Sequence, residues 1–421
     1  MPDDTRSAPS ATAAPPARSE LRRRGVRPDG LGLVVILGVM SAFGPLSIDL
    51  YLPGLPLIAR DFAVDASLVQ QSLSLFFLGL AAGQLAYGPL ADRYGRRPPL
   101  LAGIVLYFAA SLVCALAPDV STLNGARLVQ GLGAAAGPVL ARAVVRDLYE
   151  GRQAARMMSF VILVMTIAPL LAPVIGGWLT ASLGWRAAFW CLVAFAVLCL
   201  ALVQQGLPET HPPARRSGAT LLRLTAAYGP MLRAPVALGY LLCGGMTFGA
   251  LFAYVTGSPF VYTEVFGVPQ SRFGYYFAFN VLGLVIGNLI NGRLVMRYGY
   301  RRMLGAAVTV MFAASWLLAG LTLGGETRLA VLAAPLFLAV GTVGMAAANT
   351  VAGLLDRYPQ NAGAASALFG LFQFGLGAVT GSAVGALGDD PLLAMTGVMA
   401  GAATIAMGSY ITLRWLVRRG I

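Results

Sequence analysis

Twelve long apolar runs divide this chain, and each is about as long as a helix needs to cross a lipid bilayer. Such a helix takes about 20 mainly apolar residues, because hydrocarbon offers no partner for an open backbone hydrogen-bonding group. Only 11% of the 421 residues are charged and 57% are apolar, whereas soluble domains carry roughly 25% charged residues. We therefore expect an all-α integral membrane protein. The expected spans are residues 31–56, 68–90, 99–117, 121–142, 157–180, 187–206, 235–260, 271–294, 303–323, 330–353, 362–387 and 392–415.

A sequence at the end of the second run is repeated at the end of the eighth. The stretch GQLAYGPLADRYGRRPPL begins at Gly83, and GNLINGRLVMRYGYRRML begins 204 residues later at Gly287. Each copy follows the second span of its half, which indicates two homologous six-helix bundles related by an axis along the membrane normal. The second copy has Met296 where the first has Asp92, so we expect the second turn to lack the role of that carboxylate.

The arginines predict the orientation of the chain. All 30 basic residues are arginines, and with 17 acidic residues they give a formal net charge of +13. With the N-terminus in the cytoplasm, 25 arginines fall on the cytoplasmic side, four fall on the other side, and Arg127 lies within a span. Cytoplasmic loops carry the excess of basic residues, so both termini are expected in the cytoplasm. The expected partner of these basic residues is therefore the anionic surface of the membrane lipids and not nucleic acid.

The longest polar connection lies between the sixth and seventh runs. The segment before the first run is rich in Pro, Ala, Ser and Arg, a composition typical of disorder. The expected organisation is a disordered cytoplasmic tail at residues 1–30, bundles at 31–206 and 235–416, a cytoplasmic linker at 207–234 and a cytoplasmic tail at 417–421.

The residues of metal and acid–base chemistry are scarce. The single histidine, His211, lies in the Pro-rich linker, and no metal or cofactor site is expected. Four cysteines lie in apolar runs without CxxC spacing and are interpreted as small core side chains. An enzyme within the membrane is disfavoured, because the chain has a single histidine, and a single carboxylate within its spans, from which to build a catalytic site. A channel is disfavoured by the duplicated architecture with one intramembrane charge of each sign. The cysteines are Cys114, Cys191, Cys199 and Cys243.

Several segments in order resemble signatures of the major facilitator superfamily. GPLADRYGRRP, from Gly88, resembles its loop 2–3 signature, and ARLVQGLGAAAG, from Ala126, resembles its span 4 signature. APLLAPVIGG, from Ala168, is similar to the span 5 signature of its antiporters. GPLSIDLYLPGLP, ARAVVRDLYEG and GSPFVYTEVFG resemble the bicyclomycin/chloramphenicol-resistance (Bcr/CflA) branch of drug:proton antiporters. The resemblance implies the major facilitator fold, with twelve transmembrane helices in two pseudo-symmetric six-helix bundles.

The function implied is proton-coupled efflux of small amphipathic drugs across the bacterial inner membrane by a monomer. No nucleotide-binding motif is present, so the energy is expected from the proton gradient. Two alternatives share the fold: export of a metabolite, and import of a nutrient by proton symport. The span 5 signature and the segment around Asp49 argue against uptake.

Two charged residues within the spans are candidates for proton coupling. Asp49 lies well inside the first run, and a carboxylate removed from water favours its protonated form. The alternative is an ordinary interfacial acid, if Pro53 and Pro56 end the helix early. Arg127 must find acceptors or a watery cavity. The resemblance assigns this arginine to proton coupling, a helix-packing role through backbone carbonyls is the alternative, and a depth estimate predicts that it faces the same cavity as Asp49.

The turn after the second span is a candidate conformational latch. Its glycines permit a tight reversal, and its carboxylate can pair with arginines or cap a neighbouring helix. Similar transporters use this cluster to hold the two halves together in the outward-open state, and the arginines also fix the topology. The expected latch residues are Gly88, Asp92, Arg93, Gly95, Arg96 and Arg97.

The fifth span combines helix breakers with small residues. Pro169 and Pro173 each remove a backbone hydrogen bond, and Gly176 and Gly177 allow close helix approach. We expect a kinked, tightly packed contact between the halves, which the resemblance links to antiport. Kinks without a coupling role are the alternative.

The substrate pocket is the least constrained prediction. Most aromatic residues in such a chain pack in the core or face lipid. Glu264 is expected to be an ordinary solvated acid near the outer surface. The candidates for the substrate cavity are Tyr51, Tyr254, Asn280, Phe369 and Gln373.

Overall fold

All regular elements of the described residues are helices. The structure is a computed structural model, and it describes residues 31–216, 226, 228–388 and 390–419. The predicted tail at 1–30, part of the predicted linker and the last residues of the chain lie outside this part. Eleven helices are long and apolar enough to cross a membrane, or twelve if the bent pair at the start counts as one span. This confirms the all-α membrane fold.

The first bundle contains the helices of residues 31–206. Each predicted span matches one helix or one interrupted helix. Its elements are α2 (Leu31–Ser41), α3 (Phe43–Asp49), the 3₁₀ helix η1 (Leu52–Gly54), α4 (Leu55–Asp61), α5 (Ala66–Tyr94), α6 (Arg97–Leu116), α7 (Val120–Ala134), α8 (Ala136–Leu148), α9 (Gly151–Leu183) and α10 (Arg186–Gly206).

The second bundle contains the helices from residue 235 onward. Two short elements in the predicted linker precede it: the 3₁₀ helix η2 (Pro213–Arg215) and α12 (Tyr228–Arg233), which packs against α13 and α18. The bundle elements are α13 (Pro235–Phe260), the π-helical turn η3 (Val261–Val265), α14 (Gln270–Tyr298), α15 (Tyr300–Leu323), α16 (Leu329–Gly341), α17 (Val343–Arg357), the 3₁₀ helix η4 (Pro359–Asn361), α18 (Ala362–Ala386) and α19 (Pro391–Arg418).

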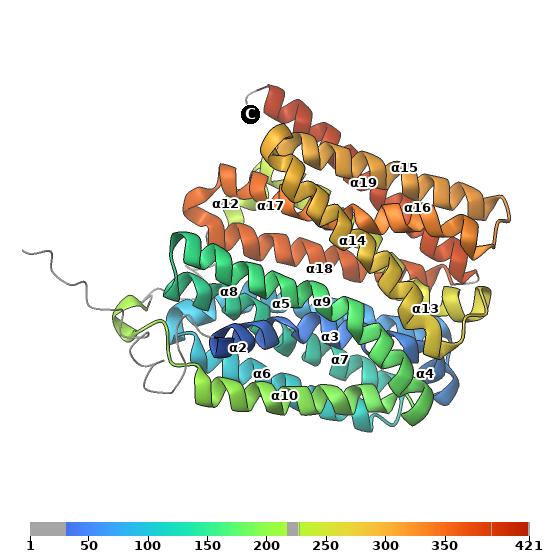
Figure 1. The fold of residues 1–421 in the computed structure, drawn as a ribbon, viewed down its shortest axis with the longest axis horizontal. Coiled ribbons are helices and arrows are strands. Elements are labelled where there is room, and N and C mark those ends of the chain that lie inside the picture. Colours follow the sequence, from blue (N-terminus) through green and yellow to red (C-terminus); the bar gives the residue numbers. More distant parts are fainter. Residues whose placement is uncertain (1–30, 217–225, 227, 389, 420–421) are drawn as a thin grey trace, which may run out of the picture.

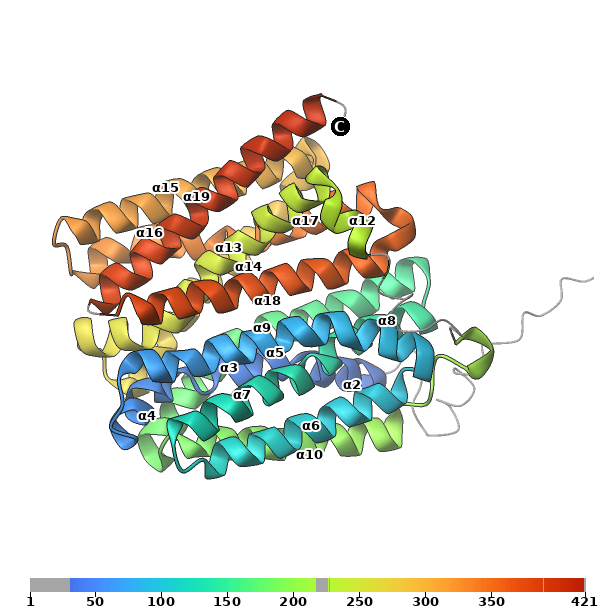
Figure 2. The same ribbon diagram turned by 180° about the vertical axis from the view of Figure 1, so that it is seen from behind.

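The two bundles lie side by side and meet along two seams (Figures 1 and 2). At one seam α5 packs against α18, and at the other α14 packs against α9. The second span of each half therefore packs against the fifth span of the other half. This reciprocal pairing is the one that a two-fold axis between duplicated bundles requires, and it agrees with the repeat in the sequence.

The first span is interrupted twice. α2 and the stretch Phe43–Asp61 meet at an angle of 48°, and α3 ends at Asp49. Pro53 and Pro56 then begin η1 and α4, because proline suits the first turn of a helix and not its interior. The helix ends early, as the prolines suggested, and Asp49 at this end is buried inside the protein.

Both copies of the repeated turn depend on a glycine backbone. Gly95 and Gly299 have φ values of 94° and 77°, a region that glycine adopts without the steric cost of a Cβ atom. The turns differ in their polar contacts, since Met296 is 89% exposed where the first copy has Asp92. The second turn therefore has no carboxylate at the position of Asp92, and its carboxylate contact is the hydrogen bond from Tyr300 to Asp356, at 2.8 Å.

The four cysteines do not all behave as predicted. Cys114, Cys199 and Cys243 are buried, as expected for core side chains, and all four thiols are free. Cys191 is exposed on α10, so the core prediction is wrong for this residue. An apolar run reveals a membrane helix, but it does not tell which of its faces meets lipid.

Candidate functional site

A cleft of about 340 Å³ lies between the bundles at the end of the molecule that carries the Asp92–Arg97 turn. We call this end the arginine end. Helices α5, α8 and α9 form one wall, and α12, the end of α17 and the start of α18 form the other. Most lining residues are apolar. The polar lining side chains are Gln84, Asp92, Arg96, Arg142, Arg146, Tyr228 and Ser366.

At the opposite end the two bundles are in direct contact. Gln270 at the start of α14 donates through Nε2 to the carbonyl of Pro53, at 3.0 Å. Gln70 near the start of α5 donates through Nε2 to the carbonyl of Thr256 on α13, at 3.4 Å. Closer to the middle of the same helices, the rings of Phe77 and Phe252 lie 4.2 Å apart between centroids. The described structure is therefore sealed at one end, with its cleft at the other, which is one state of an alternating-access cycle.

Asp49 lies at the end of α3 and its side chain is buried, with 5% exposure. Within the described residues it has neither a hydrogen bond nor an ion pair. Its electrostatic neighbour is the phenol of Tyr254, on α13 of the other bundle. A charged carboxylate in such a place is costly unless it is paired. The site therefore favours a neutral carboxyl group in this conformation.

Arg127 is fully buried inside the first bundle, on α7. Its guanidinium lies over the rings of Phe76 and Tyr51, 4.1 and 4.6 Å from their centroids. Nη1 donates to Oε1 of Gln130, at 2.5 Å, whereas Nε and Nη2 have no partner in the described structure. Desolvated cation–π contacts are worth about 2 kcal/mol or more, so aromatic rings stabilise this cation in place of an acid.

Asp49 and Arg127 have different surroundings. Tyr51 contacts Arg127 and bonds to Ser72 inside its own bundle. The electrostatic neighbour of Asp49 is Tyr254 of the other bundle, whereas Arg127 interacts with Tyr51, Cys114 and Tyr107 of its own bundle. The depth argument placed the two charges at one level but carried no information on direction. The structure does not bring them together.

Two of the predicted cavity residues form a polar cluster with a third residue. Asn280 on α14 donates through Nδ2 to the hydroxyls of Tyr254 and Tyr262, at 3.2 and 2.9 Å. All three residues are buried, and Oδ1 of Asn280 has no partner among the described residues. Together with Asp49, this cluster brings polar groups of both bundles to one place. Tyr262 was not predicted, although its family-like segment GSPFVYTEVFG was singled out.

The other predicted cavity residues lie elsewhere. Tyr51 belongs to the Arg127 cluster. Phe369 on α18 is buried and packs against Phe248, with 6.2 Å between ring centroids. Gln373 is partly buried and has no hydrogen bond within the described structure. Glu264 is exposed, as expected for a solvated acid.

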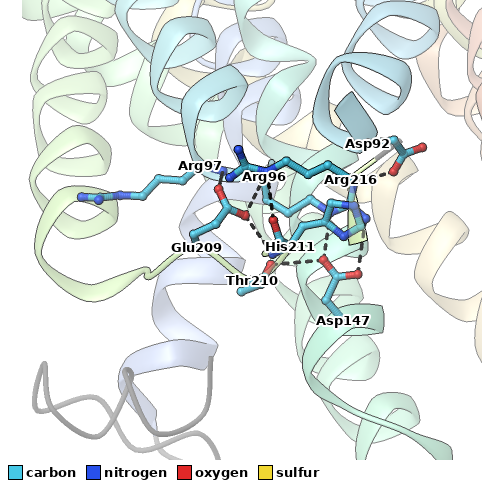
Figure 3. A network of polar contacts seen from close by, with 8 residues as sticks. All are labelled: Asp92, Arg96, Arg97, Asp147, Glu209, Thr210, His211 and Arg216. Carbon is cyan, nitrogen blue, oxygen red and sulfur yellow. Dashed lines mark hydrogen bonds and ion pairs between the residues drawn. The ribbon is translucent and has the colours of Figure 1, made fainter. Parts of the chain in front are cut away.

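The turn after α5 is the centre of a polar network (Figure 3). Arg96 donates through Nη1 to Asp92, at 2.6 Å, and through Nε to Asp147 at the end of α8, at 2.8 Å. Burial alone would lower the pKa of the Arg96 guanidinium, but the carboxylates of Asp147 and Asp92 outweigh it and raise the pKa. Arg96 therefore stays charged, and all these partners belong to the first bundle.

Glu209 extends this network and was missed by the sequence analysis. Its carboxylate accepts from the backbone N–H groups of Arg96 and Arg97, at 2.8 and 3.1 Å. A Cβ atom on Gly95 would lie 2.5 Å from the same carboxylate. This close approach is a second reason, besides its positive φ, why glycine is required at position 95. The only sequence signal was a polar LPET stretch after the sixth span.

The remaining latch candidates differ in their contacts. Arg97 donates through Nη2 to the carbonyl of Gln204, at 2.9 Å. Arg93 is exposed over the ring of Tyr94. Gly88 lines the cleft and has open space beside it. The side chain of Asp92 is 45% exposed and also lines the cleft.

Arg142 and Arg146 were counted among the loop arginines, but both lie in α8 and line the cleft. Arg142 donates through Nη2 to Oε1 of Gln84, at 3.4 Å. Within the described residues neither arginine pairs with a carboxylate. Their spacing of four residues, which places both on one helix face, was a signal available in the sequence. The cleft is therefore electropositive.

The fifth span, α9, packs closely against the other bundle. Pro173, Gly176 and Gly177 are buried on α9. A Cβ atom on Gly177 would lie 3.0 Å from the carbonyl of Gln270, whereas Gly176 packs against Leu50 of its own bundle. Pro169 is partly buried. α9 thus forms a tight contact between the halves, and its two prolines lie within one continuous helix.

The fold and this arrangement define a secondary membrane transporter: two duplicated bundles, a cleft between them and buried polar groups from both halves. Residues 36–382 match the Major Facilitator Superfamily. The chain belongs to this family, and it is a multi-pass membrane transporter and not an enzyme.

Relatives and a solved structure agree with this assignment. The chain is 34% identical to a bicyclomycin resistance protein homolog of Haemophilus influenzae, over 92% of this chain and 98% of the relative. It is 30% identical to a chloramphenicol resistance protein of Pseudomonas aeruginosa, over 84% and 83%. The crystal structure of a D-xylose–proton symporter shares the fold, with a TM-score of 0.70, 15% identity and coverage of 89% and 95%.

Proposed function

We propose that this transporter is a proton-coupled multidrug efflux antiporter of the bacterial inner membrane. Its cargo is small amphipathic compounds of the chloramphenicol and bicyclomycin kind, which the names of the two relatives support. The observation that carries the proton coupling is Asp49, a buried carboxyl without a cationic partner in the described structure, beside Tyr254 of the other bundle.

In this proposal both termini are cytoplasmic, so the arginine end faces the cytoplasm and the cleft admits the drug from inside. The cleft then closes as the bundles rock, and the opposite end opens. Asp49 releases its proton to the cytoplasm and takes up another from outside, while the drug moves the other way. The protein acts as a monomer, with its linker at residues 207–234 on the cytoplasmic side.

The proton gradient is sufficient for this work. One proton entering gains about 2.3 kcal/mol per 100 mV of membrane potential and about 1.4 kcal/mol per pH unit. Together these sustain roughly a few-hundred-fold gradient of a neutral drug.

Expression in an efflux-deficient bacterium tests the function. We expect a raised minimum inhibitory concentration for chloramphenicol or bicyclomycin, and a protonophore should remove efflux of the labelled drug. An unchanged drug panel, together with acid-driven accumulation of a labelled nutrient in right-side-out vesicles, would instead identify an importer.

The latch also has a testable role. Asp92 lines the cleft opposite the start of α18, and a helix N-terminus stabilises an anion. We propose that cleft closure brings this carboxylate to α18. Asp92→Asn should lower turnover about tenfold, as expected for a loss of about 1.4 kcal/mol, and change drug KM less. Glu150→Gln, an exposed acid at the same end without a side-chain cap bond, is the control. Equal effects in both variants would contradict the latch.

A further inference from the structure

A second cavity lies away from the transport cleft, between α15 and α19 at the arginine end. It is a groove of about 710 Å³. Its walls are largely apolar, and the hydroxyl-bearing rings of Tyr240 and Tyr410 lie along it. The arginines that line this groove are Arg301, Arg302, Arg414 and Arg418.

None of the described residues that line the groove is acidic. The carboxylate of Asp356 reaches one of these arginines only indirectly. It accepts a hydrogen bond from the hydroxyl of Tyr300, at 2.8 Å, and the same hydroxyl accepts from Nε of Arg301, at 3.2 Å. In the described part of the chain, Arg302, Arg414 and Arg418 form no ion pair. The groove therefore has a strong excess of positive charge.

The duplicated sequence explains why these arginines are available. Tyr300 and Met296 occupy the repeat positions of Arg96 and Asp92, so the second turn lacks the charged network of the first. The arginines that follow in the second copy, Arg301 and Arg302, line the groove. On α19, Arg414 and Arg418 are one turn apart and share a face.

The residues beside the groove are typical of a membrane interface. Trp415 lies between Arg414 and Arg418 in the sequence of α19 and is 49% exposed. The guanidinium carbon of Arg419 lies over its ring, 3.9 Å from the ring centroid. Exposed tryptophans are enriched at the membrane interface. Further along the helices toward the membrane centre, Val310 and Ile411 are exposed apolar residues on which acyl chains can lie.

We propose that this groove is a binding site for the headgroup of an anionic phospholipid. The four arginines bind phosphate oxygens, and the acyl chains lie along α15 and α19. Basic pockets between membrane helices suit such headgroups. With several cations in one groove, a lipid with two phosphates, such as cardiolipin, should bind more tightly than phosphatidylglycerol, and a zwitterionic lipid least.

Titration of the purified transporter with cardiolipin, followed by native mass spectrometry, tests the site. We compare wild type with the double variant Arg302→Gln/Arg414→Gln. Its matched control is Arg152→Gln/Arg156→Gln, which removes equal charge from the exposed start of α9. The groove variant should bind cardiolipin about 30-fold more weakly, since each arginine near an anionic lipid is worth about 1 kcal/mol. The control should change less than about threefold.

Further arms separate the alternatives. Arg302→Lys/Arg414→Lys should retain most of the affinity, and this variant also guards against misfolding of the glutamine variant. Equal losses in the groove and control pairs, or no loss in either, would overturn the proposal. So would displacement of cardiolipin by millimolar inorganic phosphate, because the groove would then be a site for the free ion.

Discussion

Replacing Asp49 with asparagine collapses the drug gradient to about equal concentrations on both sides of the membrane. Asparagine fills the same space but exchanges no proton, so the roughly few-hundred-fold gradient that one proton sustains is lost. The drug should still bind, because the buried polar cluster around Tyr254 and Asn280 remains. The measurement is drug flux and drug binding in proteoliposomes with an imposed pH gradient.

Asp65→Asn is the matched control for this experiment. Asp65 precedes α5, is exposed and makes no side-chain cap bond, so its neutralisation should leave transport unchanged. Proton-driven efflux that survives in Asp49→Asn would remove Asp49 from the mechanism. A loss of drug binding equal to the loss of flux would make it a substrate residue instead.

Substituting valine for Gly274 should stop transport by a different route. A Cβ atom on Gly274 would lie 2.5 Å from the carbonyl oxygen of Pro173 and from backbone atoms of Val174 in the other bundle. Backbone cannot move aside as a side-chain tip does, and overpacking costs typically 1–3 kcal/mol. This cost falls on the state sealed at the opposite end, so its population should drop by a factor of about 5 to 150.

Labelling of an introduced cysteine measures this shift. Ser74 on α5 is buried at the sealed end beside Gly381, so Ser74→Cys, in a chain with Cys191→Ser, should be protected from a membrane-impermeant maleimide. Gly274→Val should increase its labelling and lower efflux at least tenfold. Gly292→Val, on the same helix with no atom within 4 Å, is the control. If the cysteine stays protected in Gly274→Val, the loss of transport does not come from the contact between α14 and α9.

The fold could be predicted because each span carries its own signal. Length and apolar character identify a membrane helix without any knowledge of its neighbours, and the repeat at Gly83 and Gly287 adds the relation between the halves. The ends of α5 and α14 agree with the predicted spans to within a few residues. The second interruption of the first span could also be predicted, because Pro53 and Pro56 act on the local backbone, whereas the 48° bend after Ser41 could not.

The contacts of the site could be predicted only in part. Asp49 and Arg127 were identified from the cost of intramembrane charge, but direction around a helix depends on what each face meets. Glu209 reaches the Arg96–Arg97 backbone across more than a hundred residues of chain, and no local pattern encodes such a partner. Arg142 was counted with the loop arginines because it is the last residue of the predicted fourth span, whereas its helix continues to Leu148.

The two reciprocal seams restrict how this molecule can move. α5 with α18, and α14 with α9, lie on either side of the pseudo-two-fold axis, so tilting one bundle against the other changes both lines of contact in the same step. A crosslink placed across either seam should therefore immobilise the whole transporter. A bulky substitution in one seam should also change the packing at the other seam. Because the bundles are duplicated, the two seams can open and close only together, in one concerted motion.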